Sequence, residues 1–237
     1  MGHEFESVDE LHVTATPEQA WDAIATGPGI DSWFMGRNEV DPGQTVRTAF
    51  GGYTPSFAIS AWEPGKRLAY SDNVGDRSVA YEFLVEGRDR GSTVLRVTAS
   101  GFLPGDDWAD EFEAMTNGNA LFFHTLSTYL THFAGRTATP VTVFGPMITD
   151  WPSTRRKLMT AISRDGDHVH FTPAGLPPVD GTVYFENDDT IGIRTDDALY
   201  RFLRGFRGPV MACHLLFTDQ EPTDQAWLAW LTTEDLT

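Results

Sequence analysis

The chain has 237 residues, enough to bury a sizeable core as one large domain or as a domain with a smaller appendage. Its 34 acidic residues against 17 basic ones give a formal net charge of -17, a field that repels phosphate backbones and anionic lipid headgroups. We therefore expect neither nucleic acid nor a membrane as a partner, unless a local basic group (Arg201, Arg204 and Arg207) overrides the mean.

The N-terminal part begins with a predicted strand and two predicted short helices. Residues 5 to 15 alternate partly between apolar and polar, which is typical of a strand. Thr16 can then cap a helix, Pro17 suits its first turn, and Gln19 at the third position completes a capping box. A Gly-Pro-Gly stretch is expected to end this helix, and a second short helix is expected over residues 30 to 35.

An antiparallel meander and a long helix are predicted next. Turn residues separate six apolar runs, which we read as strands near 37–41, 45–51, 55–63, 67–72, 78–87 and 92–101. From 106 to about 133, large apolar residues recur at steps of three and four, which predicts one long amphipathic helix. The expected fold class is α+β, a curved antiparallel sheet wrapped around this helix.

The sequence after this helix partly repeats the sequence before it. Residues 199–205 resemble 80–88, and 185–195 loosely echo 62–72 in the same order. We divide the chain into a domain over 5–135, a linker over 136–150 and a smaller α+β region over 151–237. That region is either a truncated second copy or a lid, with helices at 151–163 and 222–232 and strands near 167–172, 180–186, 190–204 and 209–218.

The order of elements in the first part resembles the START-like (SRPBCC, Bet v 1-like) superfamily, over about residues 8 to 133. More narrowly, it is similar to the bacterial branch named after the Hsp90 ATPase activator homologues. The residues that carry this resemblance are Thr16–Trp21, Trp33-Phe34, Ala61–Leu68 and Ser100–Phe102. The resemblance implies a helix-grip fold with an internal cavity for a hydrophobic guest. It leaves the function open, since this superfamily holds binders, carriers, cyclases and antibiotic self-protection proteins.

Aromatic residues are the main indication of the guest's chemistry, because flat apolar walls suit an aromatic or polycyclic molecule. Asn119 lies within the apolar stripe of the long helix, and an amide there needs a hydrogen-bond partner from the ligand or from the protein. Tyr70 and Tyr81, on neighbouring strands, offer hydroxyl groups. The candidate ligand-binding residues are Trp33, Phe34, Phe50, Phe57, Tyr70, Tyr81, Phe83, Phe112, Met115, Asn119 and Phe122.

Catalytic residues are not identified by the sequence. It contains no nucleophile elbow, phosphate loop or dinucleotide fingerprint, and His12, His124, His132 and His214 have no context that indicates a catalytic dyad. His168 and His170 share one face of a strand without a third ligand in the sequence, so neither a metal nor another cofactor is expected. The single cysteine, Cys213, excludes an internal disulfide and is expected in a buried strand.

These observations favour a protein that binds a hydrophobic small molecule for sequestration, transport or self-protection, in a natural-product setting. The alternative is a cyclase or dehydratase of the polyketide type that uses the same cavity, and a weaker one is a chaperone-interaction module. Whether the chain is an enzyme, and whether it forms a homodimer, stays open at this point. The N-terminus has no secretion pattern and no apolar run approaches the roughly 18 residues that span a bilayer, so a cytoplasmic location is expected.

Overall fold

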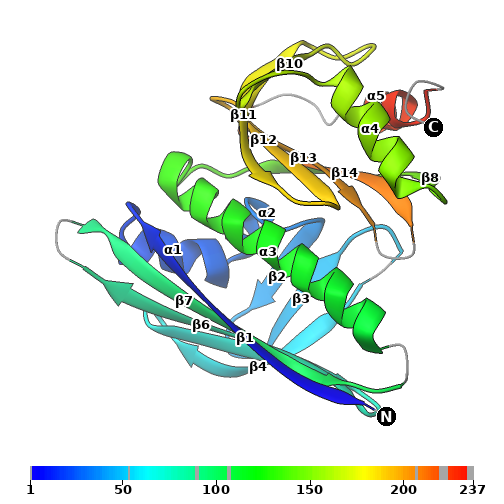
Figure 1. Ribbon diagram of the computed structural model, residues 1–237. Coiled ribbons are helices and arrows are strands. Elements are labelled where there is room, and N and C mark those ends of the chain that lie inside the picture. Colours follow the sequence, from blue (N-terminus) through cyan, green and yellow to red (C-terminus); the bar gives the residue numbers. More distant parts are fainter. Residues whose placement is uncertain are drawn as a thin grey trace. The chain divides into compact units, whose positions relative to one another are not determined.

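The chain divides into two compact units, Met1–Thr137 and Ala138–Thr237. The structure, a computed structural model, describes residues 2–52, 54–88, 91–105, 108–205, 208–218 and 224–233, and for 108–111 and 114 the backbone alone. Each unit contains one seven-stranded antiparallel sheet with its own helices (Figure 1).

The first unit is a helix-grip fold, as the resemblance predicts. Its sheet has the order β1-β7-β6-β5-β4-β3-β2, with all neighbours antiparallel. The long helix α3 (Trp108–His132) lies across one face of this sheet (Figure 1). The strands are β1 (His3–Val13), β2 (Arg37–Asp41), β3 (Thr45–Ala49), β4 (Ser56–Glu63), β5 (Arg67–Val74), β6 (Arg77–Gly87) and β7 (Thr93–Leu103).

Two short helices, α1 (Pro17–Ala25) and α2 (Gly27–Asp31), connect β1 to β2. The predicted capping box of α1 is confirmed, because the Gln19 amide donates to Thr16 Oγ1 over 3.3 Å and the Thr16 amide donates to Gln19 Oε1 over 2.9 Å. The predicted second helix over 30–35 is wrong in its position. Thr26 caps a new helix immediately, its Oγ1 accepting from the Gly29 amide over 3.0 Å, so the Gly-Pro-Gly stretch begins α2.

The second unit repeats the strand order of the first. Its sheet has the order β8-β14-β13-β12-β11-β10-β9, so here too the first strand pairs with the last and the others follow in reverse. Strand β13 therefore corresponds to β6, and β11 and β12 correspond to β4 and β5, which are the strands whose sequences resemble each other. The strands are β8 (Thr139–Met147), β9 (Ser163–Asp165), β10 (His168–Phe171), β11 (Val179–Glu186), β12 (Thr190–Arg194), β13 (Ala198–Arg204) and β14 (Pro209–Leu216).

The second copy is more complete than the sequence suggests. The segment expected as a linker, 136–150, contains strand β8, with Val141 and Val143 buried. Pro140 is compatible with this strand because β8 lies at the sheet edge, where a missing amide donor leaves no gap in the ladder. The predicted strand 190–204 is two strands, β12 and β13, and β9 was not predicted.

The final helix of the second copy is shorter than that of the first. Helix α5 (Asp224–Leu231) has 8 residues where α3 has 25, and one helix, α4 (Trp151–Ala161), takes the place of α1 and α2. Trp227 and Trp230 of α5 belong to the core of this unit, together with Phe171 and Phe202 of the sheet. The start of the predicted helix 222–232 and the first two residues of the predicted helix 106–133 lie outside the described residues.

Candidate functional site

Four aromatic side chains cover the α3-facing side of strands β4, β5 and β6. Tyr70 is directly opposite Tyr81 in the ladder, and its ring centroid lies 5.8 Å from that of Tyr81, 5.5 Å from Phe57 and 5.9 Å from Phe83. The rings come together because alternate residues of a strand share a face and directly opposed residues are neighbours. Tyr70 is thus the centre of the group.

Three further rings extend this group toward α2 and α3. Trp33 lies 6.4 Å from Phe83 and 5.5 Å from Phe34, and Phe34 in turn lies 4.5 Å from Phe122 of α3. The Trp33 Nε1 donates to the Ala23 carbonyl over 2.9 Å, so its ring orientation is fixed by α1. Seven of the eleven predicted residues therefore form one continuous aromatic surface. We call it the aromatic surface below: Trp33, Phe34, Phe57, Tyr70, Tyr81, Phe83 and Phe122.

Asn119 lies at the polar edge of the aromatic surface. The Tyr81 hydroxyl donates to Asn119 Oδ1 over 3.3 Å, and both side chains are half-buried. The sequence left open whether the amide meets a ligand or a protein group, and the structure gives it a protein partner. The hydrogen bond connects β6 with α3 across the interior of the first unit.

Tyr70 has a desolvated hydroxyl group and a side chain that is still partly accessible to solvent. Desolvation, with a smaller contribution from Tyr81, raises the pKa of the Tyr70 phenol far above its ordinary value. The side chain is nevertheless only half-buried by accessible area, unlike Phe83, which is fully buried.

The remaining three candidates are half-buried. Phe112 of α3 lies 5.8 Å from Phe5 of β1, a ring that the sequence analysis did not single out. Phe50 and Met115 are also half-buried. Their place in the site stays a prediction.

A buried polar network that the sequence did not indicate holds α2 against the sheet. Asp31 Oδ1 accepts from the backbone amide of Asn38 over 2.7 Å and from its side-chain Nδ2 over 3.0 Å, while Asn38 Oδ1 accepts from Thr48 Oγ1 over 2.7 Å. Desolvation raises the pKa of Asp31, although these hydrogen bonds and Arg37 oppose the rise. Because Trp33 follows Asp31 closely, the network positions one end of the aromatic surface.

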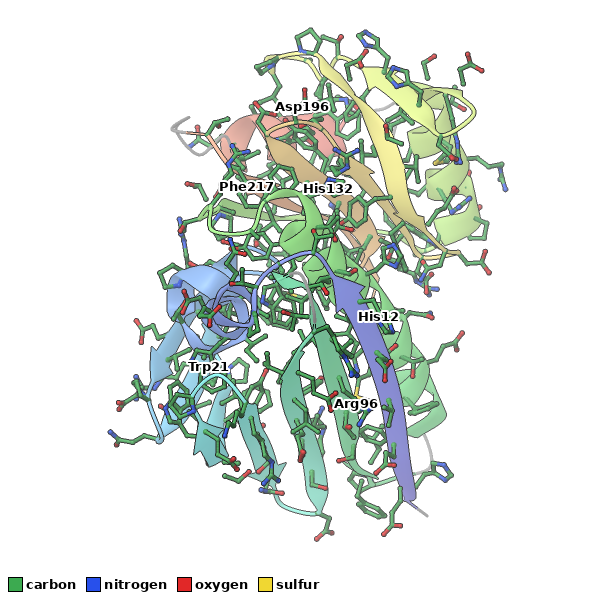
Figure 2. All side chains as sticks on the ribbon, turned by 90° about the vertical axis from the view of Figure 1, so that its left-hand side faces the viewer. His12, Trp21, Arg96, His132, Asp196 and Phe217 are labelled. Atoms are coloured by element: carbon green, nitrogen blue, oxygen red, sulfur yellow. The ribbon has the colours of Figure 1, made fainter. Side chains whose placement is uncertain are left out.

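The histidines of the first unit lie away from this interior. His12 is exposed on β1 and pairs with Glu10 over 3.0 Å, and Glu10 also accepts from Arg96 on the neighbouring strand β7 over 3.1 Å (Figure 2). His124 and His132 of α3 are exposed. None of these three side chains is therefore in a position to act on a molecule between the sheet and α3.

The interior of the second unit is filled by its own aromatic side chains. The ring of His214 lies 4.2 Å from Trp227, 5.0 Å from Phe202 and 5.1 Å from Tyr200. Its Nδ1 accepts from the Arg201 amide over 3.1 Å, and desolvation lowers the pKa of His214 well below its ordinary value. Trp227 of α5 thus packs against residues of β13 and β14 in the interior of this unit.

The candidate basic group is not a surface patch. Arg201 is fully buried, and its Nε donates to the Cys213 carbonyl over 2.5 Å, while Arg204 lies 3.8 Å from Asp189 and Arg207 is outside the described residues.

The prediction that Cys213 is buried is confirmed, and desolvation raises the pKa of its thiol to about 11. Within the described part of the chain, no helix is long and apolar enough to span a bilayer.

The described residues contain no convergent set of metal-ligating side chains. No group of three or more histidine, cysteine, aspartate or glutamate side chains in this part of the chain is arranged to hold an ion. His168 and His170 are exposed on β10, as predicted from their spacing, and Asp180 of the neighbouring strand β11 contacts both.

Comparison with known proteins gives structural likeness only. No family model matches the sequence, and no curated protein matches it. Protein MLL2253 from Mesorhizobium loti is 26% identical over 53% of this chain and 96% of its own, with a TM-score of 0.46.

Two solved structures are similar to both units. DynU16, a protein in the dynemicin biosynthetic locus, is 17% identical over 94% of this chain and 91% of its own, with a TM-score of 0.43. The di-domain ARO/CYC BexL from the BE-7585A biosynthetic pathway is 10% identical over 90% of this chain and 85% of its own, with a TM-score of 0.44. Since these scores lie below 0.5, the helix-grip assignment rests on strand order and on the placement of α3.

Proposed function

We propose that the first unit binds an uncharged, flat hydrophobic molecule, aromatic or polycyclic, between its sheet and α3. The observation that supports this most is the environment of Tyr70. Its phenol is remote enough from bulk water for desolvation to raise its pKa, yet part of its side chain stays accessible. We take this accessible surface to face a space between the sheet and α3, and a space lined by rings favours an apolar guest.

The chemistry of the residues around this space determines the class of guest. The eleven candidate residues carry no formal charge, and a charged ligand buried among them would lose its hydration without gaining an ion pair. Ring edges and faces at centroid distances of 4.5 to 6.4 Å offer the offset and edge-on contacts that flat molecules make. The Tyr81 hydroxyl and the Asn119 amide provide one polar contact for a carbonyl or hydroxyl group.

Binding without chemical change is favoured over catalysis. General acid or base catalysis requires a group whose pKa lies near the working pH. The candidate residues contain no histidine or carboxylate, and the raised pKa of Tyr70 makes its phenol a poor proton donor at neutral pH. A sequestering, carrier or self-protection role therefore fits the site better than a polyketide cyclase or dehydratase.

Native mass spectrometry tests the proposal and separates the two alternatives. The full chain is purified from its own producing cells, the mass of any bound compound is measured, and the released compound is incubated with fresh protein. A hydrophobic compound that rebinds unchanged supports the binder. A compound that is converted shows an enzyme, and Tyr70, Tyr81 and Asn119 are then the first residues to substitute.

A further inference from the structure

A second candidate site lies on the exposed face of the strands β9, β10 and β11, outside the first unit. His168 and His170 alternate on β10, so both point to the same face, about 6.7 Å apart along the strand. Asp180 of β11 is directly opposite His170 in the ladder, and directly opposed residues are close neighbours. Strand pairing thus brings a third candidate ligand, Asp180, next to the two histidines, although it is not near them in the sequence.

The contacts among the three side chains are already close to those of a metal site. His168 Nε2 lies 3.2 Å from Asp180 Oδ1, and His170 Nδ1 lies 3.2 Å from Asp180 Oδ2. In a tetrahedral site with metal–ligand distances of about 2.0–2.1 Å, neighbouring ligand atoms are separated by about 3.3 Å. Each contact therefore has about the length that separates two ligand atoms in a zinc site, although the two contacts use different carboxylate oxygens.

The donors are paired and do not yet surround a common centre, because each imidazole meets a different carboxylate oxygen. This agrees with the absence of a ready-made metal cluster among the described residues. All three side chains are more than half exposed, with exposed fractions of 58%, 57% and 64% for His168, His170 and Asp180. Holding one ion therefore requires these exposed side chains, none of which is packed in the core, to rotate until the two imidazoles and the carboxylate face a common centre.

The surroundings of the three side chains favour a cation. The residues opposite them in register on this face are hydroxyl or carboxylate side chains, namely Ser163, Asp165 and Thr182, and the nearest cation on this face by register is Arg194, one strand further, opposite Thr182. Arg164 is paired with Val169 and therefore points to the other face, where it lies 2.6 Å from Glu186. The net charge of -17 further attracts cations to the molecule.

We propose that His168, His170 and Asp180 bind a divalent first-row transition-metal ion on the outer face of the second unit. Two imidazoles and one carboxylate suit Zn²⁺, and water completes the coordination of an exposed ion. Bound metal cross-links β10 to β11 and stabilises this edge of the sheet, because an ion that binds only the folded state raises its stability. The proposal is independent of the small-molecule site in the first unit.

Isothermal titration of the untagged full chain with ZnCl₂ at neutral pH tests the proposal. We expect one Zn²⁺ per chain, and at least a tenfold loss of affinity in each of His168→Ala, His170→Ala and Asp180→Asn. His12→Ala is the matched control, since His12 is also exposed and pairs with one carboxylate, Glu10, at 3.0 Å. Circular dichroism of each variant verifies that the fold is retained.

The control variant is expected to bind Zn²⁺ as the unchanged chain does. The proposal is overturned if no saturable binding is seen, if the three variants bind as tightly as the unchanged chain, or if His12→Ala weakens binding as much as they do. A zinc-dependent rise in thermal stability that is lost in Asp180→Asn provides a second readout.

Discussion

The Tyr81 hydroxyl donates to Asn119 Oδ1 over 3.3 Å, joining β6 to α3 inside the first unit. The two residues are 38 positions apart in the chain, and both keep accessible surface. A hydrogen bond of this length between half-buried groups is easily exchanged for one to a ligand, because the net value of such a bond is only about 1 kcal/mol. The pair is therefore suited to give an apolar guest one polar contact.

Substitution of Tyr81 by Phe is expected to weaken the binding of a ligand that has a hydroxyl group and to leave the binding of an apolar ligand unchanged. The variant should bind 2-naphthol about fivefold more weakly, corresponding to about 1 kcal/mol for one hydrogen bond, while its affinity for naphthalene stays unchanged. Fluorescence titration measures both. Tyr200→Phe in the filled interior of the second unit is the matched control, and an equal change for both probes would contradict the role of the hydroxyl.

The phenol of Tyr70 is expected to stay protonated throughout the ordinary tyrosine titration. Desolvation raises its pKa, so Tyr70→Phe should leave the number of phenols that ionise near the usual pKa of about 10 unchanged. Ultraviolet absorbance of tyrosinate during alkaline titration counts these groups. Loss of one group titrating near pH 10 in the variant would show that Tyr70 is in contact with bulk water.

The carboxylate of Asp31 is expected to stabilise the folded state as a hydrogen-bond acceptor. Asp31→Ala leaves the buried Asn38 amide donors without their partner, which costs about 1–3 kcal/mol of unfolding free energy. Asp31→Asn retains an acceptor oxygen and should cost less. Urea unfolding of the two variants measures the difference, and equal losses would argue that the negative charge itself is what stabilises α2.

Acid should destabilise the second unit through His214. Its pKa in the folded state is lowered well below the ordinary 6.5, by desolvation first and by Arg201 second. The unfolded chain therefore binds a proton below about pH 6.5 that the folded unit does not, so stability is full above that pH and falls as the pH decreases. The expected slope is about 1.4 kcal/mol per pH unit.

His214→Phe is expected to remove this slope, since Phe does not titrate and suits a site formed by Tyr200, Phe202 and Trp227. The substitution also removes the acceptor of the buried Arg201 amide, which should cost about 1–3 kcal/mol at every pH. Hydrogen exchange of β13 and β14 at several pH values reports the stability of this unit alone. His12→Phe on the exposed face of β1 is the control. An undiminished acid slope in His214→Phe would assign the effect to other groups.

Local sequence signals predicted the elements of the first unit well. The capping box of Thr16 and Gln19 acts over three residues, and the alternation of β4 to β7 is visible in the chain itself. The position of α2 was missed because Thr26 serves both as the C-cap of α1 and as the N-cap of α2. A Gly-Pro-Gly stretch usually ends a helix, and here it starts one.

The long-range pairings could not be read from the chain. The rings of the aromatic surface were identified by residue type, but the Tyr81–Asn119 bond and the Asp31–Asn38 network depend on how distant segments meet. Pro140 concealed strand β8, since edge strands tolerate proline and central ones do not. Arg201 was considered only as part of a local basic group, and its burial on β13 follows from sheet packing that no local pattern reveals.

The central claim, an internal space beside Tyr70, is tested most directly by filling it. Asn119→Trp places a larger side chain on α3 where Asn119 meets Tyr81, whose ring lies 5.8 Å from that of Tyr70. Binding of the neutral probe N-phenyl-1-naphthylamine is measured by fluorescence, with Leu228→Trp on the exposed side of α5 as control. We predict saturable binding of one probe per unchanged chain and per control chain, and its loss in Asn119→Trp. No saturable binding to the unchanged chain, or undiminished binding to Asn119→Trp, would contradict the account.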